Sequence, residues 1–169
     1  AVAYAREAPD KVVFKPWDGN GGFGVMVTGK GDGNLRAMFE VLSDRGRRMI
    51  QVQHYIPEIA SGDKRIILVD GEPAGWFNRV PSPGDHRGNM HVGARVESCE
   101  LTSRDREICA ALAPRLSAEG LLFTGIDVIG PYLTEINEQC PTGIWEIKML
   151  MGLDLAGIIT NRVASVFEA

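Results

Sequence analysis

The chain has 169 residues, 44% of them hydrophobic and 24% charged, which are ordinary globular values that exclude a disordered or fibrous protein. Its net charge of −4 argues against a nucleic-acid-binding protein that depends on overall positive charge. No apolar run approaches the ~18 residues that cross a bilayer and no signal peptide opens the sequence, so we expect no membrane segment.

The first elements are a helix and short strands around a glycine-rich loop. Residues 1–8 resemble the end of a helix with no cap before it, so we expect the chain to be a fragment cut within an element. Residues 11–15 predict a strand, and residues 25–27 predict a second strand after the glycine-rich loop of residues 19–24. Apolar residues at helical spacing then predict a helix over residues 35–46.

The middle of the chain has the pattern of consecutive strands followed by a long loop. Residues 49–55 predict a strand, and residues 64–69 and 73–80 predict a hairpin because the intervening Asp-Gly pair is a strong two-residue turn signal. Residues 81–94 show no periodicity and are interrupted by proline and glycine. Loops of this length are usually functional, so we expect this loop to serve the site.

Two helices and a second hairpin complete the pattern. A capping box at residues 102–105 predicts a helix that Gly120 closes. Residues 123–129 and 133–138 predict two antiparallel strands, and a last amphipathic helix begins near Asp154. Successive hairpins with interspersed helices indicate an α+β fold with mainly antiparallel sheet.

The glycine-rich loop is suited to binding phosphate. Gly19, Gly21 and Gly24 fit the GxGxxG fingerprint, but the dinucleotide-binding fingerprint opens a helix and this loop enters a strand. Glycine backbone amides can approach phosphate oxygens, and Lys15 just before the loop supplies a positive charge. The segment therefore predicts a flap over nucleotide phosphates, with a plain glycine-rich hairpin as the alternative.

The second hairpin carries a predicted metal site. If its strands pair across a three-residue turn, Asp127 lies opposite Glu135, and Asn137 projects from the same face. Opposed carboxylates repel each other, and Mg²⁺, which favours carboxylate and amide oxygens, would remove the repulsion. These three residues are the predicted metal ligands, and a solvated polar face is the alternative. The other face is expected to be buried and consists of Ile126, Val128, Thr134 and Ile136.

Six motifs then occur in the order of a known family. They are Lys15–Gly22, Gln53–Pro57, Gly62–Arg65, Arg87–Asn89, Asp127–Gly130 and Thr134–Asn137. Together they resemble the ATP-grasp domain of prokaryotic glutathione synthetase over nearly the whole chain. The resemblance implies two lobes that grip ATP: about 1–55 as a smaller lobe with the flap, and about 56–169 as a larger lobe with the lid loop and the Mg²⁺ site. It also implies an N-terminal substrate domain that is absent from this chain.

The resemblance implies a reaction as well. ATP would phosphorylate the carboxylate of gamma-glutamylcysteine, and the amine of glycine would displace phosphate to give glutathione, ADP and phosphate. The implied partners are these small molecules and the missing N-terminal domain, and a homo-oligomer is compatible with the family. Two alternatives stay open, another ATP-grasp amino-acid ligase and a non-catalytic nucleotide-binding module. We expect the fragment alone to have weak or no activity.

The implied residue roles follow the motifs. Lys15, Gly21 and Gly22 would hold the phosphates, and Asp63 would face the ribose. The adenine pocket would be lined by Gln53, His54, Tyr55 and Ile56. The residues implied at the acyl phosphate are Arg65, Arg79 and Arg87. Substrate contacts would come from Arg65, Arg87, Asn89, Pro141 and Thr142, with residues 81–94 closing as a lid that excludes water.

The remaining candidate residues predict no further chemistry. The three histidines share no ligand spacing, so we assign none of them to a metal. The three cysteines form no CxxC pair, which argues against a zinc site or a disulfide framework. A reducing compartment, the cytoplasm, is therefore expected.

Overall fold

The computed structural model describes residues 1–167, and their contacts divide the chain into two compact units. The first unit contains residues 1–60 and 81–94, and the second contains residues 61–80 and the chain from residue 95 onward. The long loop therefore groups with the first unit, whereas the resemblance implied a place in the larger lobe. The physical reason is that its tip packs on the glycine-rich loop.

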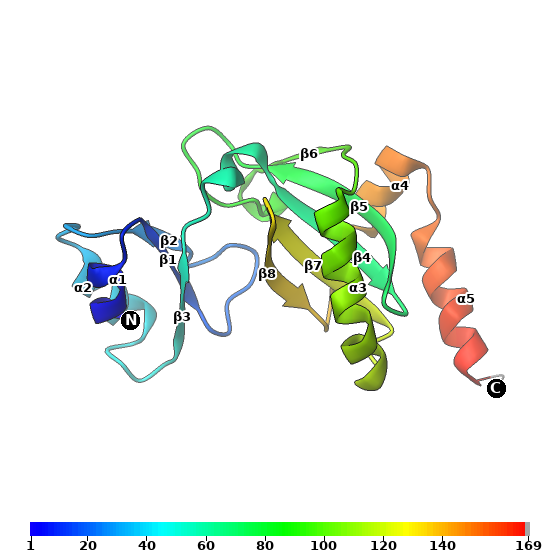
Figure 1. The fold of residues 1–169 in the computed structure, drawn as a ribbon, viewed down its shortest axis with the longest axis horizontal. Helices are drawn as coiled ribbons and strands as arrows, with labels where there is room; N and C mark the ends of the chain where they lie inside the picture. The colour runs from blue at the N-terminus through cyan, green and yellow to red at the C-terminus, as the bar shows by residue number, and fades with distance from the viewer. Residues whose placement is uncertain (168–169) are drawn as a thin grey trace. The chain divides into compact units, whose positions relative to one another are not determined.

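The first unit is a small antiparallel sheet with two helices (Figure 1). Its strands lie in the order β2-β1-β3, and both pairs are antiparallel. Helices α1 and α2 cover one face of the sheet with apolar side chains. The elements are α1 (Val2–Glu7), β1 (Val12–Pro16), β2 (Met26–Thr28), α2 (Leu35–Leu42) and β3 (Ile50–His54).

Alternation along β1 sorts its side chains onto two faces. Val12 and Phe14 are fully buried, and they pack with Ala5 of α1 and Leu35 of α2. Because successive strand residues point to opposite faces, Lys15 lies on the face away from the helices. The core of this unit therefore lies on the face opposite Lys15.

Helix α2 is shorter than predicted. It ends at Leu42, whereas the apolar spacing predicted an end at Gly46. Asp44, Arg45 and Gly46 all have positive φ angles, which end a right-handed helix. The predicted end was wrong because the left-handed turn begins with residues other than glycine.

The second unit is built on a five-stranded sheet in the order β6-β5-β4-β7-β8, and all neighbouring strands are antiparallel. The turn between β4 and β5 has positive φ at both Asp70 and Gly71, which confirms the predicted hairpin. The short strand β6 was not predicted. The strands are β4 (Asp63–Val69), β5 (Glu72–Val80), β6 (Arg95–Glu97), β7 (Phe123–Ile129) and β8 (Tyr132–Asn137).

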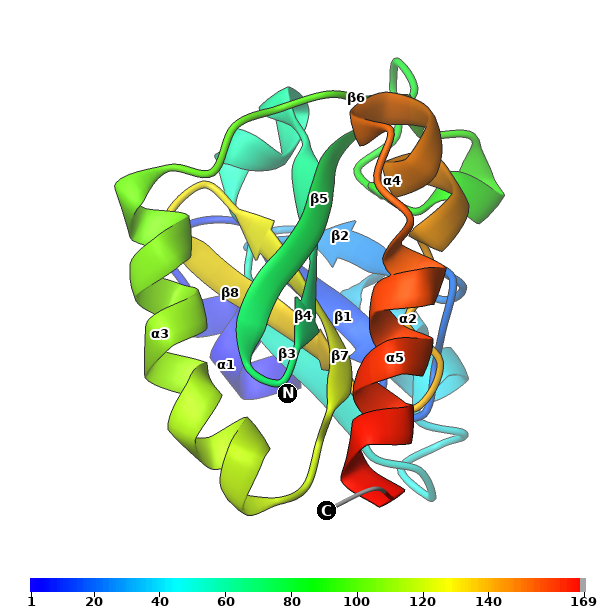
Figure 2. The same cartoon turned by 90° about the vertical axis from the view of Figure 1, so that its right-hand side faces the viewer.

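Helices α3 (Ser103–Ala118) and α4 (Ile144–Met151) lie on opposite faces of this sheet (Figure 2). Trp76 of β5 packs into the core that α3 covers. Its neighbour Gly75 faces α4, since a Cβ there would lie 2.7 Å from Ile147 Cγ2. The face of the sheet that is turned away from α3 carries the polar side chains of the predicted site residues.

The helix ends are only partly as predicted. The capping box of α3 is present, with the Thr102 hydroxyl accepting from the Asp105 amide and the Asp105 carboxylate accepting from the Thr102 amide. The last helix, α5 (Leu155–Phe167), begins where predicted, but α4 was not predicted. None of the helices within residues 1–167 is long and apolar enough to cross a membrane.

Candidate functional site

The predicted site residues of the second unit gather on one face of its sheet. Cross-strand partners share a face, and so do residues two apart along a strand. The register pairs Arg65 with Asp127 and Asp127 with Glu135, so these three residues form a row across three strands. The opposite face carries Ile66 and Ile126 and packs against α3. The site face carries Asp63, Arg65, Arg79, Asp127, Glu135 and Asn137.

Two aspartates and two arginines of this face form a buried ionic network. Arg65 donates to Asp127 twice, from Nε to Oδ1 at 2.6 Å and from Nη2 to Oδ2 at 3.1 Å. Arg79 Nη2 lies 2.6 Å from Asp63 Oδ2 and 3.0 Å from Asp127 Oδ1. The four side chains belong to residues that are at most 7% exposed. Buried charges are stable only when they are paired, so each member depends on the others.

The two aspartates of the network differ in acidity. Burial and the negative charge of Asp127 raise the pKa of Asp63 to about 7, and Arg79 and Arg65 offset this only in part. Burial also raises the pKa of Asp127, but Arg79 and Arg65 outweigh it and hold the pKa below its ordinary value. Asp127 is therefore anionic at neutral pH, as a metal ligand must be.

The second hairpin differs from the predicted pairing beyond Asp127. Asp127 lies opposite Glu135 as predicted, but the register shifts by one residue from Val128 onward. Thr134 is left out of the pairing, and its hydroxyl donates to the Asp127 carbonyl oxygen at 3.1 Å. The connection is consequently two residues long rather than three, so the predicted partners of Val128 and Ile129 were wrong.

The apolar face of this hairpin is buried on one strand only. Ile126 and Val128 of β7 are 0% and 2% exposed, as predicted. Ile136 of β8 is 43% exposed, and Thr134 is half-buried. The prediction was wrong for β8 because it is the edge strand, which has no neighbour on its outer side.

The oxygen ligands on β7 and β8 fit Mg²⁺, but the predicted repulsion between the two carboxylates is not what requires the ion. Asp127, Glu135 and Asn137 offer two carboxylates and an amide oxygen, which is the ligand chemistry of this ion. The buried amide nitrogen of Asn137 has no hydrogen-bond partner within residues 1–167, so the structure gives the donor side of this amide no protein acceptor. However, Arg65 and Arg79 already neutralise Asp127, so repulsion between the two acids does not by itself require a cation.

Asn137 is decisive for the metal prediction. Within the described chain no three His, Cys, Asp or Glu side chains group as a metal site. A cation here would therefore depend on an amide oxygen as well as the two acids.

Asp63 and Arg79 lie deeper than their predicted roles require. Arg79 is 2% exposed and directs its guanidinium at Asp63 and Asp127, which makes it a residue that positions Asp127. Asp63 Oδ2 accepts from Arg79, while Oδ1 is buried with no hydrogen-bond partner among the described residues. This placement gives no support to the predicted ribose contact of Asp63.

The predicted substrate segment at residues 141–142 lies beside the network. Arg65 Nη1 donates to the Thr142 carbonyl oxygen at 3.1 Å. A Cβ on Gly125 of β7 would lie 2.7 Å from Pro141 Cβ, so glycine is needed for this close approach. Arg65 thus links the predicted metal ligand Asp127 to the predicted substrate segment.

In the first unit, the glycine-rich loop touches the long loop. Gly22 has a φ of +79°, and a Cβ there would lie 2.6 Å from Asn89 Oδ1. Arg87 Nη1 donates to the Gly22 carbonyl oxygen at 3.4 Å. The predicted phosphate flap and two predicted substrate-binding residues therefore lie side by side.

Asp85, which was not among the predicted site residues, organises the tip of the long loop. Its Oδ1 accepts from the backbone amides of His86 at 2.7 Å and Arg87 at 3.0 Å. Its Oδ2 accepts from Arg87 Nη2 at 2.6 Å, and this bond lowers the pKa of Asp85 to about 2. An aspartate two residues before an arginine in a loop is a local signal that could have identified it.

The predicted adenine strand divides its side chains between two faces. Gln53 pairs with Val13 and so shares the Lys15 face, whereas His54 pairs with Val12 on the helix face. His54 Nε2 lies 2.7 Å from the hydroxyl of Tyr4 in α1. Only the backbone of His54 is therefore placed to serve a ligand on the Lys15 face.

Tyr55, next in the chain, contacts the long loop. Its hydroxyl lies 2.9 Å from His86 Nδ1, and the two rings meet edge to face. The Lys11 ammonium lies 5.8 Å from the centre of the Tyr55 ring. The end of the predicted adenine strand and the predicted lid are therefore in direct contact.

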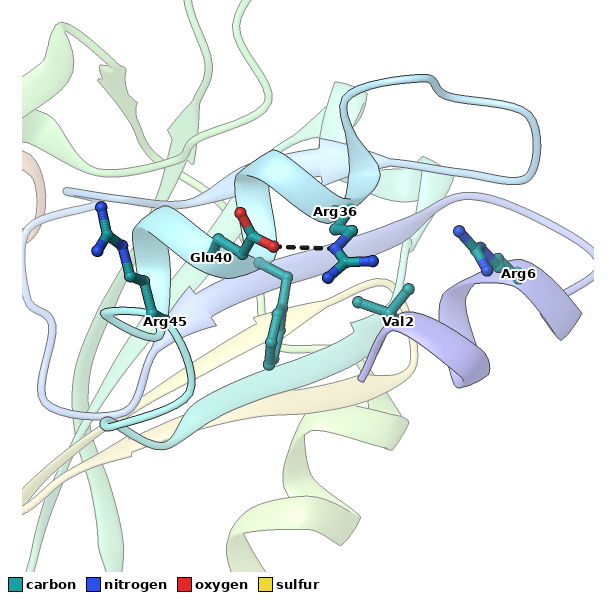
Figure 3. A pocket seen from close by; sticks show the side chains of 6 residues that line it. Val2, Arg6, Arg36, Glu40 and Arg45 are labelled. Atoms are coloured by element: carbon teal, nitrogen blue, oxygen red, sulfur yellow. Dashed lines mark hydrogen bonds and ion pairs between the residues drawn. The ribbon is translucent and has the colours of Figure 1, made fainter.

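A separate cavity of about 490 Å³ lies at α1 and α2 of the first unit (Figure 3). Arg36 pairs with Glu40 at 2.9 Å across its lining. Because α1 and α2 cover the face opposite Lys15, this cavity is distinct from the predicted nucleotide site. It is lined by Val2, Arg6, Arg36, Phe39, Glu40 and Arg45.

The sequence matches a known family along most of its length. The description "Prokaryotic glutathione synthetase, ATP-grasp domain" matches residues 2–152. A glutathione synthetase of Synechococcus elongatus is 53% identical over 143 residues, which are 85% of this chain and 44% of that protein. A glutathione synthetase of Agrobacterium fabrum is 44% identical over 168 residues, which are 99% of this chain and 53% of that protein. The chain spans about half the length of these curated relatives.

Solved structures share the fold at low sequence identity. D-alanine–D-alanine ligase from Bacillus anthracis, complexed with ATP, has a TM-score of 0.66 at 17% identity, with 94% of this chain and 54% of that chain covered. The ATP-grasp ligase PsnB, complexed with a phosphomimetic variant of its minimal precursor, Mg and ADP, has a TM-score of 0.60 at 16% identity, with 92% and 46% covered. The predicted α+β fold with antiparallel sheets and flanking helices is confirmed.

Proposed function

The chain belongs to the prokaryotic glutathione synthetase ATP-grasp family, and we propose that it forms the MgATP-binding part of a ligase that makes glutathione. ATP phosphorylates the carboxylate of gamma-glutamylcysteine to an acyl phosphate. The amine of glycine attacks the acyl carbon, and the C–O bond to phosphate breaks. The products are glutathione, ADP and phosphate, and the proton of the amine passes to solvent.

The observation that carries the proposal is the ionic row on the site face. Asp127 is buried and kept anionic by Arg65 and Arg79, and Glu135 lies directly opposite. A fold that needed only stability would gain little from the buried Asp127 carboxylate, since buried ion pairs are often no better than apolar packing. With Asn137, these acids would hold Mg²⁺, which when bound neutralises phosphate charge.

The first unit supplies the groups proposed for the triphosphate and the base. Lys15 lies on the sheet face free of helices, and Gly21 and Gly22 have positive φ angles that turn the flap. Lys15 would act as a point charge on phosphate, and the flap amides would donate to phosphate oxygens. Gln53 and the backbone of residues 54–56 would contact the adenine.

In the proposed reaction the main task of the site is to exclude water, and no residue is assigned as a general acid or base. An acyl phosphate is readily hydrolysed, so the lid of residues 81–94 would shield it until the amine attacks. Arg87 would stabilise negative charge on phosphoryl oxygens. Arg65 would act near the substrate through Asp127 and Thr142, and Asn89 would contribute a substrate contact.

The setting of the reaction is also part of the proposal. Cys99, Cys109 and Cys140 are free thiols in the described chain, which is consistent with a reducing compartment. We place the reaction in the cytoplasm, with the substrate domain and any homo-oligomer contact supplied by the longer protein. Its expected partners are the small-molecule substrates.

Calorimetry of MgATP, compared with ATP plus a chelator, tests the nucleotide part. We expect binding to be stronger with Mg²⁺, and equal binding in the two conditions would favour a non-catalytic module. Phosphate release by a protein of the relatives' length, with gamma-glutamylcysteine and a panel of acceptor amines, tests the reaction. Turnover with another amine but not with glycine would identify a different ATP-grasp ligase. The same assay on this chain checks the expectation that it is weak or inactive alone.

A further inference from the structure

The tip of the lid depends on a single carboxylate. Besides the bonds already given, Asp85 Oδ1 accepts from Arg87 Nε at 2.9 Å, so one side chain holds both the backbone and the guanidinium of Arg87. The Asp85 side chain is 24% exposed and that of Arg87 is 32% exposed, so water competes only in part for this pair. Charge-assisted bonds of this kind are stronger than neutral ones.

The base of the loop is closed independently of this pair. Ser82 Oγ donates to the Gly93 carbonyl oxygen at 2.7 Å, joining the two ends of the loop. The Asp85 amide donates to the Ser82 carbonyl oxygen at 2.9 Å, which sets the start of the tip. The tip therefore projects from a defined base, and Asp85 decides where the side chains beyond it point.

The two residues that follow Asp85 contact two different parts of the proposed nucleotide site. The His86 ring contacts Tyr55 at the end of the adenine strand. The Arg87 guanidinium contacts the Gly22 carbonyl oxygen of the phosphate flap. Because Asp85 binds the amides of both residues, it fixes both contacts at once.

We propose that Asp85 is a positioning residue, which holds Arg87 against the flap and His86 against Tyr55 so that the lid closes over bound nucleotide. Asp85 itself touches neither substrate nor nucleotide and acts through Arg87. The link to nucleotide rests on the proposed function, whereas the hold on Arg87 is a property of the protein alone.

Two substitutions of Asp85 distinguish the effect of its bonds to the backbone amides from the effect of its charge on Arg87. Asp85→Asn keeps an oxygen that accepts from the two backbone amides but removes the charge that holds the guanidinium. Asp85→Ala removes both. Asp44→Asn is the control for loss of an aspartate charge, because Asp44 pairs with Arg47 at 2.6 Å in the same unit but outside the lid.

The first measurement is hydrogen exchange at Arg87 Nε and at the His86 and Arg87 amides, followed by NMR without nucleotide. In Asp85→Asn we expect Nε to exchange about tenfold faster, because the acceptor Oδ2 of Arg87 Nε and Nη2 is lost and Oδ1 is no longer charged, with the amides nearly unchanged. In Asp85→Ala we expect exchange to become faster at Arg87 Nε and at both backbone amides. In Asp44→Asn we expect the exchange rates at these three groups to stay at their wild-type values. Unchanged Nε exchange in Asp85→Asn would overturn the proposal.

The second measurement is the Kd for MgATP by calorimetry. We expect it to rise about tenfold in Asp85→Asn and to stay at the wild-type value in Asp44→Asn. A wild-type Kd in Asp85→Asn overturns the positioning role. Failure of the wild-type chain to bind MgATP overturns the proposed function instead, and Nε exchange then still decides whether Asp85 holds Arg87.

Discussion

Asp127 and Arg65 form a two-point ion pair across neighbouring strands, with donor–acceptor distances of 2.6 and 3.1 Å. The pair holds both oxygens of the Asp127 carboxylate in a fixed plane on the site face. Glu135 lies on the other side of Asp127 in the same row. A cation bound between these acids would therefore meet one ligand held by Arg65 and one that is exposed on the edge strand.

Replacing Glu135 by Gln should weaken MgATP binding about tenfold and leave binding of ATP with a chelator unchanged. The expected size is that of losing one charged interaction with a ligand. Because Glu135 is exposed on an edge strand, the urea midpoint should stay close to the wild-type value. Equal loss with and without Mg²⁺ in calorimetry would argue against Glu135 as a metal ligand.

Replacing Arg79 by Met should lower the free energy of unfolding by about 3–5 kcal/mol, because buried Asp63 loses its arginine partner and buried Asp127 keeps only Arg65. Urea denaturation measures this loss. Arg162→Met is the control, since Arg162 pairs with Asp70 at the surface and such pairs contribute about 0–1 kcal/mol. Equal effects of the two substitutions would contradict the dependence of the network on Arg79.

The stability of the chain should depend on the protonation of Asp63. Its pKa is raised to about 7 in the folded state, against about 3.9 when unfolded, so the folded chain binds more protons between these values. The Asp63 contribution is therefore fully present below pH 4 and is lost as the pH rises through 7. One such group changes the free energy of unfolding by at most about 1.4 kcal/mol per pH unit.

Urea unfolding of the wild type and Asp63→Asn between pH 5 and 8 checks this sign. The wild type should lose stability relative to the variant as the pH rises. Asp127 has the opposite sign, because its pKa is lowered and its contribution is lost only as the pH falls below 4. A constant difference between the two proteins across this range would show that Asp63 does not titrate there.

Replacing Gly22 by Ala should displace the flap from the lid. The φ of +79° disfavours a side chain, and the new Cβ would collide with Asn89. We expect weaker MgATP binding and a stability loss of about 1–3 kcal/mol. Gly31→Ala is the matched control, since Gly31 also has a positive φ of +89° but a Cβ there meets nothing within 4 Å. Similar behaviour of the two variants would indicate that contact with the lid is irrelevant to the flap.

Local signals in the sequence predicted much of the fold. The turn at residues 70–71 and the capping box at Thr102 and Asp105 are encoded in a few adjacent residues, and both are present. Helix α4 was missed because its apolar residues surround the helix rather than forming one stripe. Gly152, with φ of +68°, marks its end and was the available signal.

The site was less predictable than the fold. Opposition of Asp127 and Glu135 follows from one hairpin and was predicted. The bond from Arg65 to Asp127 spans 62 positions and requires β4 and β7 to be neighbours, which no local pattern states. The sequence therefore predicted that Asp127 lies opposite Glu135, but not that Arg65 and Arg79 bind the Asp127 carboxylate.

The alternation along β4 has a consequence for how this protein can change in length. The Arg65 side chain lies on the site face, and the side chain of its neighbour Ile66 lies in the hydrophobic core under α3. Inserting or deleting a single residue ahead of Arg65 within β4 would move Arg65 to the core face and Ile66 to the site face. A shift of one residue turns every following side chain of the strand to the opposite face. Variation among related genes should thus accumulate in the connections, while the number of residues in β4 stays constant.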